Sequence, residues 1–326
     1  MTETGTTRWA VWRNERAFVI VCVLFGGFVR TILASLPRVV HGDEPSYLLI
    51  ARSLAQGKGL LLHGRPDLHY GPLFPWALSL LLRLRDDPEW ASATLYVLAG
   101  ALLAVPVYLL VRALHDATTA RLATLLVTLF PAFTAAPLFT LRMTEPLYHL
   151  HLSGAMACAL RAMQPGTVSL PAYVGVGVGF GLAYLTRPEA VAYLAVFVGL
   201  WMLVHFGFMP RSLHPPPFSH VAIERESGEA STPPSPEASG EEGRRMRGMG
   251  HALGLALAMG LFAVLAAPYV LYLHGQTGQW LLSGKVQITF DIGSNVIRGD
   301  SRGYDETVAA LDAAGQELIW FSPDRF

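Results

Sequence analysis

Two adjacent carboxylates, Asp43 and Glu44, are the residues of this sequence best placed to do chemistry. They follow directly on the first long apolar segment, and acidic side chains are costly in hydrocarbon, so a pair at this position needs a reason. One reason is that the pair marks the point where the chain leaves the bilayer. The other is proton transfer at the membrane surface, where a carboxylate acts as a general base.

Further polar residues lie at the ends of apolar segments or in loops beside prolines. Each has an ordinary explanation: Glu145 and Glu189 can complement a helix dipole, Arg187 can extend its charge toward the headgroups, and His69 can be an exposed loop residue. Together with the acidic pair they predict a polar cleft at one membrane surface. The cleft would offer a base, metal ligands and an unpaired cation for a phosphate.

This set of groups fits a reaction at an isoprenoid-phosphate lipid, whose tail stays in the bilayer while its phosphate sits at the surface. A guanidinium suits phosphate oxygens and stays charged, which makes Arg187 the candidate cation. Asp43 is the candidate base that deprotonates an acceptor hydroxyl, and Glu44 supports it. A cation or metal ion would stabilise the departing phosphate.

The composition indicates that membrane helices position these residues. Of the 326 residues, 52% are hydrophobic and 15% charged, and the mean hydropathy is +0.40, whereas about a quarter of the residues of a soluble domain are charged. The formal net charge of zero gives no sign of a nucleic-acid partner. Cys22 and Cys158 both lie in apolar segments, which predicts neither a disulfide framework nor a zinc-thiolate site. We predict an all-α polytopic membrane protein.

Seven apolar segments are predicted to cross the membrane. Arginines before the first of them place the N-terminus, residues 1–16, in the cytoplasm. Lys and Arg counted over all loops do not support this orientation, so it rests on the first segment. It puts the loops 39–90 and 274–326 outside, together with the polar cleft. The segments cover approximately residues 17–37, 92–111, 122–141, 146–162, 171–186, 190–208 and 252–273.

The first outer loop is predicted to contain two short helical runs. Residues 47–54 form an amphipathic run that glycines end. Residues 73–84 are strongly apolar, but twelve residues are too few to span, which predicts a helix in the membrane interface. Arg30, inside the first apolar segment, is expected to extend outward to the headgroups or to pair with a carboxylate.

Three other stretches carry structural predictions. Alternate glycines from Gly175 to Gly181 give two overlapping small-xxx-small pairs, which favour close helix packing. Residues 211–247 are poor in apolar residues and rich in Pro, Ser, Glu and Gly, which predicts a disordered cytoplasmic linker. Beyond residue 273 the chain is mixed, with some strand character over 280–290 and a helix predicted over 306–318.

The stretch around the acidic pair resembles the first-loop motif of polytopic GT-C glycosyltransferases, of the protein O-mannosyltransferase and lipid A aminoarabinose transferase type. Other stretches recur in that family in the same order, and the resemblance covers roughly residues 15–275. The resembling stretches are Asp43-Glu44-Pro45-Ser46-Tyr47, Ala51-Arg52-Ser53-Leu54-Ala55 with Gly57-Lys58-Gly59, His69 to Pro75, Thr144-Glu145-Pro146-Leu147, and Leu185-Thr186-Arg187-Pro188-Glu189.

The resemblance implies a seven-span GT-C module over residues 17–273, with amphipathic helices in its first outer loop. It implies an inverting transfer from a polyprenyl-phosphate sugar to a protein, lipid or polysaccharide acceptor, at the outer face of the cell membrane. By position, Asp43 matches the family's catalytic base, while Arg187 and Arg52 would bind the donor phosphate. His69 falls where lipid A transferases place a metal-binding carboxylate, which leaves a divalent metal ion as an option. The remaining cleft residues would be Tyr47, Tyr70, Glu145 and Glu189.

Two other classes of protein remain as alternatives. A transporter would carry ionisable residues or broken helices at mid-span, whereas here the ionisable residues cluster at one surface. An inactive lipid-binding module would keep the fold without turnover. Family members usually continue with further spans, so a chain that stops within residues 274–326 is expected to be a fragment or a minimal module.

Overall fold

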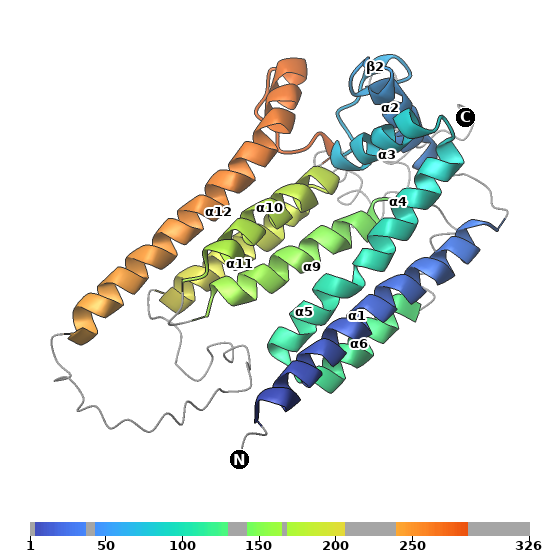
Figure 1. Cartoon of the computed structure of the whole chain (residues 1–326). Coiled ribbons are helices and arrows are strands. Elements are labelled where there is room, and N and C mark those ends of the chain that lie inside the picture. Colours follow the sequence, from blue (N-terminus) through green and yellow to red (C-terminus); the bar gives the residue numbers. More distant parts are fainter. Residues whose placement is uncertain (1–3, 37–42, 130–141, 165–167, 206–238, 286–326) are drawn as a thin grey trace, which may run out of the picture. The chain divides into compact units, whose positions relative to one another are not determined.

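A computed structural model describes residues 4–36, 43–129, 142–164, 168–205 and 239–285. These residues are mostly helical (Figure 1), which confirms the predicted all-α class. By length and composition, the helical stretches Asn14–Ala34, Pro88–Leu114 and Gly248–Thr277 are suited to cross a membrane. The shorter apolar helices are Leu73–Leu84, Ala117–Leu129, Leu170–Thr186 and Ala190–His205. The predicted spans 122–141 and 190–208 continue beyond the described residues.

The chain divides into two compact units. The first comprises Met1–Leu36, Tyr96–Ala136 and Thr144–Ala266. The second comprises Pro37–Leu95, Pro137–Met143 and Ala267–Phe326.

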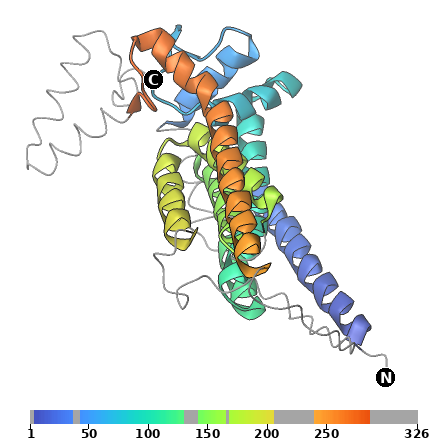
Figure 2. The same cartoon turned by 90° about the vertical axis from the view of Figure 1, so that its left-hand side faces the viewer.

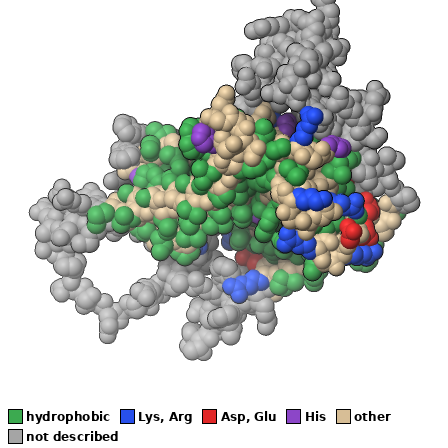
Figure 3. Space-filling model, turned by 90° about the horizontal axis from the view of Figure 1, so that it is seen from above, with side chains coloured by type: hydrophobic (Ala, Val, Ile, Leu, Met, Phe, Trp, Pro, Cys, Tyr) green, Lys and Arg blue, Asp and Glu red, His purple; other side chains and the backbone are tan. Residues whose placement is uncertain are grey.

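The first unit is a bundle of apolar helices that run alongside one another (Figures 1 and 2). Helix α9 packs on α10 and α5, α5 packs on α6, and α1 packs on both α5 and α6. Hydrophobic side chains cover much of the described surface in Figure 3, as lipid contact requires. The helices are α1 (Thr4–Ala34), the end of α4 (Pro88–Leu102), α5 (Ala104–Leu114), α6 (Ala117–Leu129), α9 (Glu145–Ala162), α10 (Leu170–Thr186), α11 (Ala190–His205) and the first part of α12 (Ser239–Thr277).

A proline explains the one-residue break between α4 and α5 at Leu103. Pro106 has no N–H to donate to the carbonyl of Leu102, and its ring crowds that carbonyl. The apolar stretch Pro88–Leu114 therefore counts as one candidate span although two helices form it.

The glycines of α10 allow two other helices to approach closely. A Cβ on Gly177 would lie 2.4 Å from the carbonyl oxygen of Ala258 on α12, and one on Gly181 would lie 2.7 Å from Leu265. Gly179, by contrast, faces Ala155 of α9. The predicted close packing is thus confirmed, with one small-xxx-small pair against each partner helix.

Arg30 is buried inside α1, with a relative exposure of 1%. Its guanidinium donates to the carbonyl oxygens of Gly26 (3.2 Å), Val127 (3.3 Å) and Thr128 (3.4 Å). The expectation that Arg30 extends outward is therefore wrong, because the guanidinium supplies donors to backbone carbonyls of α1 and α6.

The second unit is built around two short helices and a small hairpin. Helix α2 (Glu44–Ala55) packs on α3 (Leu73–Leu84) and on β1 (Leu61–Leu62). Strand β1 pairs antiparallel with β2 (Arg65–Pro66), through a turn in which His63 and Gly64 have positive φ angles of 49° and 81°. The predicted helix over 73–84 is confirmed, and the predicted amphipathic run 47–54 lies within the longer α2.

Two predictions at the C-terminal side meet the structure only in part. Helix α12 begins at Ser239, so residues 239–247 are helical and the predicted linker is wrong over these residues. Extending an existing helix costs far less than starting one, which explains why the apolar helix continues toward its N-terminus. Residues 280–285 contain no strand. The rest of the predicted linker, the rest of the stretch 280–290 and the predicted helix 306–318 lie outside the described residues.

Candidate active site

The acidic pair lies at the first turn of α2, and the helix start gives its two members different surroundings. Asp43 is the N-cap residue, and its backbone carbonyl accepts the N–H of Tyr47 at 3.2 Å. Pro45 in the first turn favours this start, because its fixed φ suits a helix and no N–H is lost. The Asp43 carboxylate makes no capping hydrogen bond and is half-buried.

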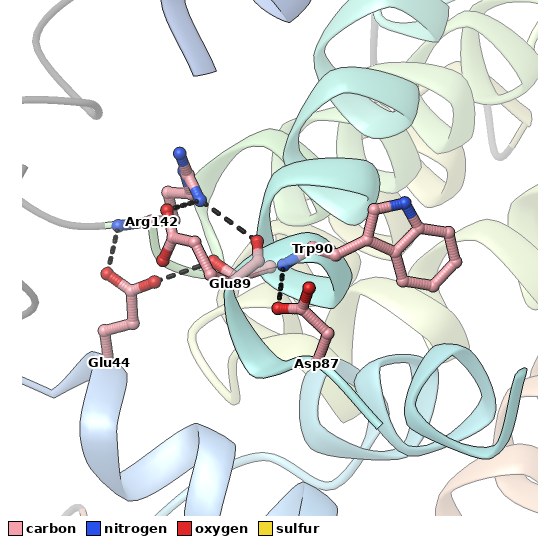
Figure 4. Close-up of polar contacts among 6 residues, drawn as sticks. Glu44, Asp87, Glu89, Trp90 and Arg142 are labelled. Carbon is pink, nitrogen blue, oxygen red and sulfur yellow. Dashed lines mark hydrogen bonds and ion pairs between the residues drawn. The ribbon is translucent and has the colours of Figure 1, made fainter. Parts of the chain in front are cut away.

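Glu44 is 1% exposed, and both of its carboxylate oxygens accept hydrogen bonds. Oε1 accepts the hydroxyl of Ser92 at 2.6 Å, and Oε2 accepts the backbone N–H of Arg142 at 3.0 Å (Figure 4). A buried carboxylate needs such partners, because burial without them costs several kcal/mol. Glu44 therefore ties α2 to the start of α4 and to the segment at Arg142.

Arg142 extends this network to the first turn of α4. Its side chain is 1% exposed, and Nη1 lies 2.6 Å from Oε1 of Glu89. Asp87 accepts the N–H of Trp90 at 3.0 Å and so caps the same helix end (Figure 4). The network holds Glu44, the second member of the acidic pair, in place.

An aromatic cluster packs against α2 beside the acidic pair. The ring of Tyr47 lies 4.6 Å from that of Tyr70 and 5.0 Å from that of Phe74, measured between centroids. Burial raises the pKa of Tyr70, and the charge of Asp43 raises it further, whereas Ser46 lowers it. Tyr47 and Tyr70, both predicted cleft residues, thus lie together next to Asp43.

Asp67 is a buried carboxylate that the sequence analysis did not single out. It is 6% exposed, and it accepts the backbone N–H groups of His69 at 3.3 Å and Tyr70 at 3.1 Å. Burial raises the pKa of Asp67 to about 6, although the two N–H donors oppose the shift. The only signal in the sequence was its position two residues before His69.

His69 lies in the same turn, and burial lowers its pKa to about 3, with a smaller contribution from the charge of Lys285. A neutral imidazole can serve as a metal ligand. Within the described ranges, however, no group of three His, Cys, Asp or Glu side chains is arranged to hold a metal ion. A divalent metal ion at His69 therefore stays a prediction.

Arg52, the second predicted phosphate ligand, lies on the solvent-accessible side of α2. Its Nη2 is 3.5 Å from Oδ1 of Asp86, and both side chains are largely exposed. An exposed pair of this kind contributes little to stability, so it would not hold the guanidinium strongly.

Arg187 is the C-cap residue of α10, in the first unit, and its guanidinium forms ion pairs. Its Nη1 lies 2.8 Å from Oε1 of Glu145, its Nη2 lies 3.6 Å from Oε1 of Glu189, and its guanidinium stands over the ring of Tyr148. The prediction of an unpaired cation at this position is therefore wrong. A phosphate would have to compete with two carboxylates for the guanidinium.

The structure gathers the predicted residues into two sets. Asp43, Glu44, Tyr47, Arg52, His69 and Tyr70 lie in the second unit, and Glu145, Arg187 and Glu189 lie in the first. Sequence reasoning missed Asp67, Glu89, Ser92 and Arg142 of the second unit as parts of the site. That the two sets form one cleft stays a prediction.

Part of the chain matches a known protein family. Residues 66–219 match the family model described as dolichyl-phosphate-mannose-protein mannosyltransferase. The match confirms the predicted resemblance to GT-C glycosyltransferases; it includes His69, Glu145 and Arg187, and it begins after Asp43 and Glu44. Neither a curated protein nor a solved structure matches the chain.

Proposed function

We propose that this chain, a membrane protein of the GT-C glycosyltransferase family over residues 66–219, transfers a sugar from a polyprenyl-phosphate donor to an acceptor hydroxyl. Asp43 acts as the general base, and the reaction takes place at the outer face of the cell membrane. The family's name refers to dolichyl-phosphate mannose as donor and protein as acceptor. For this chain we propose the same class of donor and leave the acceptor as protein, lipid or polysaccharide.

The proposed reaction is a single displacement at the anomeric carbon. The acceptor oxygen forms the new glycosidic bond while the bond between the anomeric carbon and the phosphate oxygen breaks. The acceptor proton passes to Asp43, and the polyprenyl phosphate leaves with the electron pair of the broken bond. Attack opposite the leaving group inverts the anomeric configuration.

The observation that carries the base assignment is the difference between the two adjacent carboxylates. Both oxygens of Glu44 are held by Ser92 and the Arg142 N–H, and the side chain is buried, so it is poorly suited to take a proton from a substrate. Asp43 is half-buried, and its carboxylate does not cap the helix. The positive end of the α2 dipole favours the ionised form of a carboxylate at this position.

Arg52 and Arg187 remain the proposed ligands of the donor phosphate. For Arg52, two observations support this role: its side chain is exposed, and its ion pair with Asp86 is weak. For Arg187 to bind the donor phosphate, the phosphate must displace Glu145 from the guanidinium or share the guanidinium with it. The guanidinium of an arginine has five N–H donors.

The base assignment is tested with Asp43→Asn, which keeps the shape of the side chain and removes its proton acceptor. We expect sugar transfer in membranes to fall by about 10²-fold or more, with donor affinity retained. Asp116→Asn is the matched control, because it makes the same chemical change at a helix N-terminus in the other unit. Transfer by Asp43→Asn at the parent rate would show that Asp43 is not the base.

A further inference from the structure

We propose that Asp67 is a positioning residue of the Asp43 site, which it serves by holding the Tyr70 side chain beside Asp43. The inference rests on the proposed function, because it assigns Asp67 to the support of the proposed base. Nothing in the family match or in the sequence motifs gives Asp67 a role.

The first step is the turn that Asp67 orders. Its Oδ1 accepts the N–H of His69, and its Oδ2 accepts the N–H of Tyr70. Asp and Asn side chains commonly bond backbone N–H groups two or three residues ahead, which fixes the turn that follows them. Here both oxygens are used, so the peptide units on either side of His69 have set orientations.

The second step is that residues from a later part of the chain also hold this turn. The hydroxyl of Tyr272 donates to the backbone carbonyl oxygen of Asp67 at 2.9 Å and to that of Leu60 at 3.2 Å. Gly284 lies against the turn so closely that a Cβ there would be 2.2 Å from the carbonyl oxygen of Leu68. The turn is therefore enclosed, and the Asp67 carboxylate supports it from within.

The third step connects the turn to the proposed base. Tyr70 is 3% exposed, and its ring packs on Tyr47 of α2, one helical turn after Asp43. Its hydroxyl oxygen is buried and has no hydrogen-bond partner within the part of the chain that the structure describes, and the charge of Asp43 contributes to raising its pKa. A neutral hydroxyl beside a carboxylate can orient that carboxylate by donating to it, and such contacts often shorten only when substrate binds.

The cost of burying a carboxylate argues for a role beyond shaping a turn. Asn or Ser shapes the same kind of turn without a buried charge. A buried carboxylate with two N–H partners instead gives a stiff turn, and a base needs its neighbours placed within a fraction of an ångström.

The test is a double-mutant cycle between Asp67→Ala and Tyr70→Phe. The rate of sugar transfer is divided by the concentration of enzyme that binds the donor. We expect each single variant to lower kcat by about tenfold or more with donor KM nearly unchanged. If Asp67 acts through the Tyr70 hydroxyl, Asp67→Ala lowers kcat less than about twofold when Tyr70 is already Phe. Asp67→Asn keeps one acceptor oxygen, and we expect it to restore part of the rate lost in Asp67→Ala.

Asp116→Ala provides the matched structural control. It also removes a carboxylate that accepts a backbone N–H, from Thr119 at 2.7 Å, but in the unit that does not contain Asp43. We expect this control to lower thermal stability while kcat per competent enzyme stays at the parent value. If the effects of Asp67→Ala and Tyr70→Phe multiply independently, or if Asp67→Ala lowers only stability, Asp67 is not a positioning residue.

The outcome separates this inference from the proposed function. A parent rate in Asp43→Asn would overturn the base assignment, and the inference with it. A large loss in Asp43→Asn, together with independent effects of Asp67→Ala and Tyr70→Phe, would retain the base and overturn the role of Asp67 alone.

Discussion

At the scale of single residues, the structure separates carboxylates that hold the fold from the one proposed to act on substrate. Glu44 is buried with both oxygens in hydrogen bonds, whereas the Asp43 carboxylate is half-buried and does not cap its helix. Removing a buried partner leaves unsatisfied groups behind, which costs about 1–3 kcal/mol for each. Variants at these positions should therefore differ in whether they lose stability or rate.

Glu44→Ala is expected to destabilise the protein, because the Arg142 N–H and the Ser92 hydroxyl lose their acceptor in a buried site. Glu44→Gln should be much milder, since its amide oxygen can accept the N–H while its amide nitrogen donates to the Ser92 oxygen. Thermal unfolding in detergent, compared with that of Asp43→Asn, checks this prediction. Equal melting temperatures for Glu44→Ala and the parent would contradict the structural role.

Arg187 and Glu145 give a prediction about donor affinity. Because Glu145 lies 2.8 Å from the guanidinium, it competes with any phosphate bound there. We expect Arg187→Ala to weaken donor binding by about tenfold or more, the scale of a lost charged hydrogen bond, and Arg187→Lys to weaken it less. Glu145→Gln should strengthen binding. Unchanged affinity in all three variants would leave Arg187 with a structural role only.

At the scale of elements, glycines allow helices and loops to approach one another closely. In α10 one pair of glycines faces α12 and the other faces α9, which explains why small residues recur at every second position. Close backbone approach of this kind is a main source of helix association in membranes. The effect of adding one methyl group therefore depends on which helix surface receives it.

Gly177→Ala is expected to destabilise the bundle by about 1–3 kcal/mol, the usual cost of overpacking. Its new Cβ would meet the backbone oxygen of Ala258 at 2.4 Å, and backbone yields less easily than a flexible side chain. Gly199→Ala in α11 is the matched control, because nothing lies within 4 Å of its Cβ position. In that variant the higher helix propensity of Ala should leave stability equal or slightly raised. Similar melting temperatures for the two variants would refute the packing argument.

At the scale of the whole molecule, the predicted orientation places residues 39–90 outside the cell. Arg65→Cys and Asp86→Cys should then be labelled by a membrane-impermeant thiol reagent in intact cells, after subtraction of labelling at Cys22 and Cys158. His115→Cys, in the predicted cytoplasmic loop 112–121, should be labelled only after the membrane is opened. Labelling of positions 65 and 86 from opposite sides would show that the helix Leu73–Leu84 crosses the membrane.

The sequence alone was enough to predict the class of the protein, the bounds of α3 and the close packing of α10. The division of the acidic pair into a base and a support stays a prediction. Apolar length, proline positions and glycine spacing are local properties, and local properties decide whether a helix forms and how close another can come.

Only the tertiary structure decided which partners meet. Glu44 and Arg142 are 98 residues apart along the chain, as are Arg30 and Thr128, and no periodicity in the sequence relates such positions. The same holds for Arg187, which was predicted to be unpaired in a short turn and which folding places against Glu145. A buried charge takes whatever donors or acceptors packing brings to it, because leaving it unsatisfied in a low-dielectric interior costs more than almost any local preference.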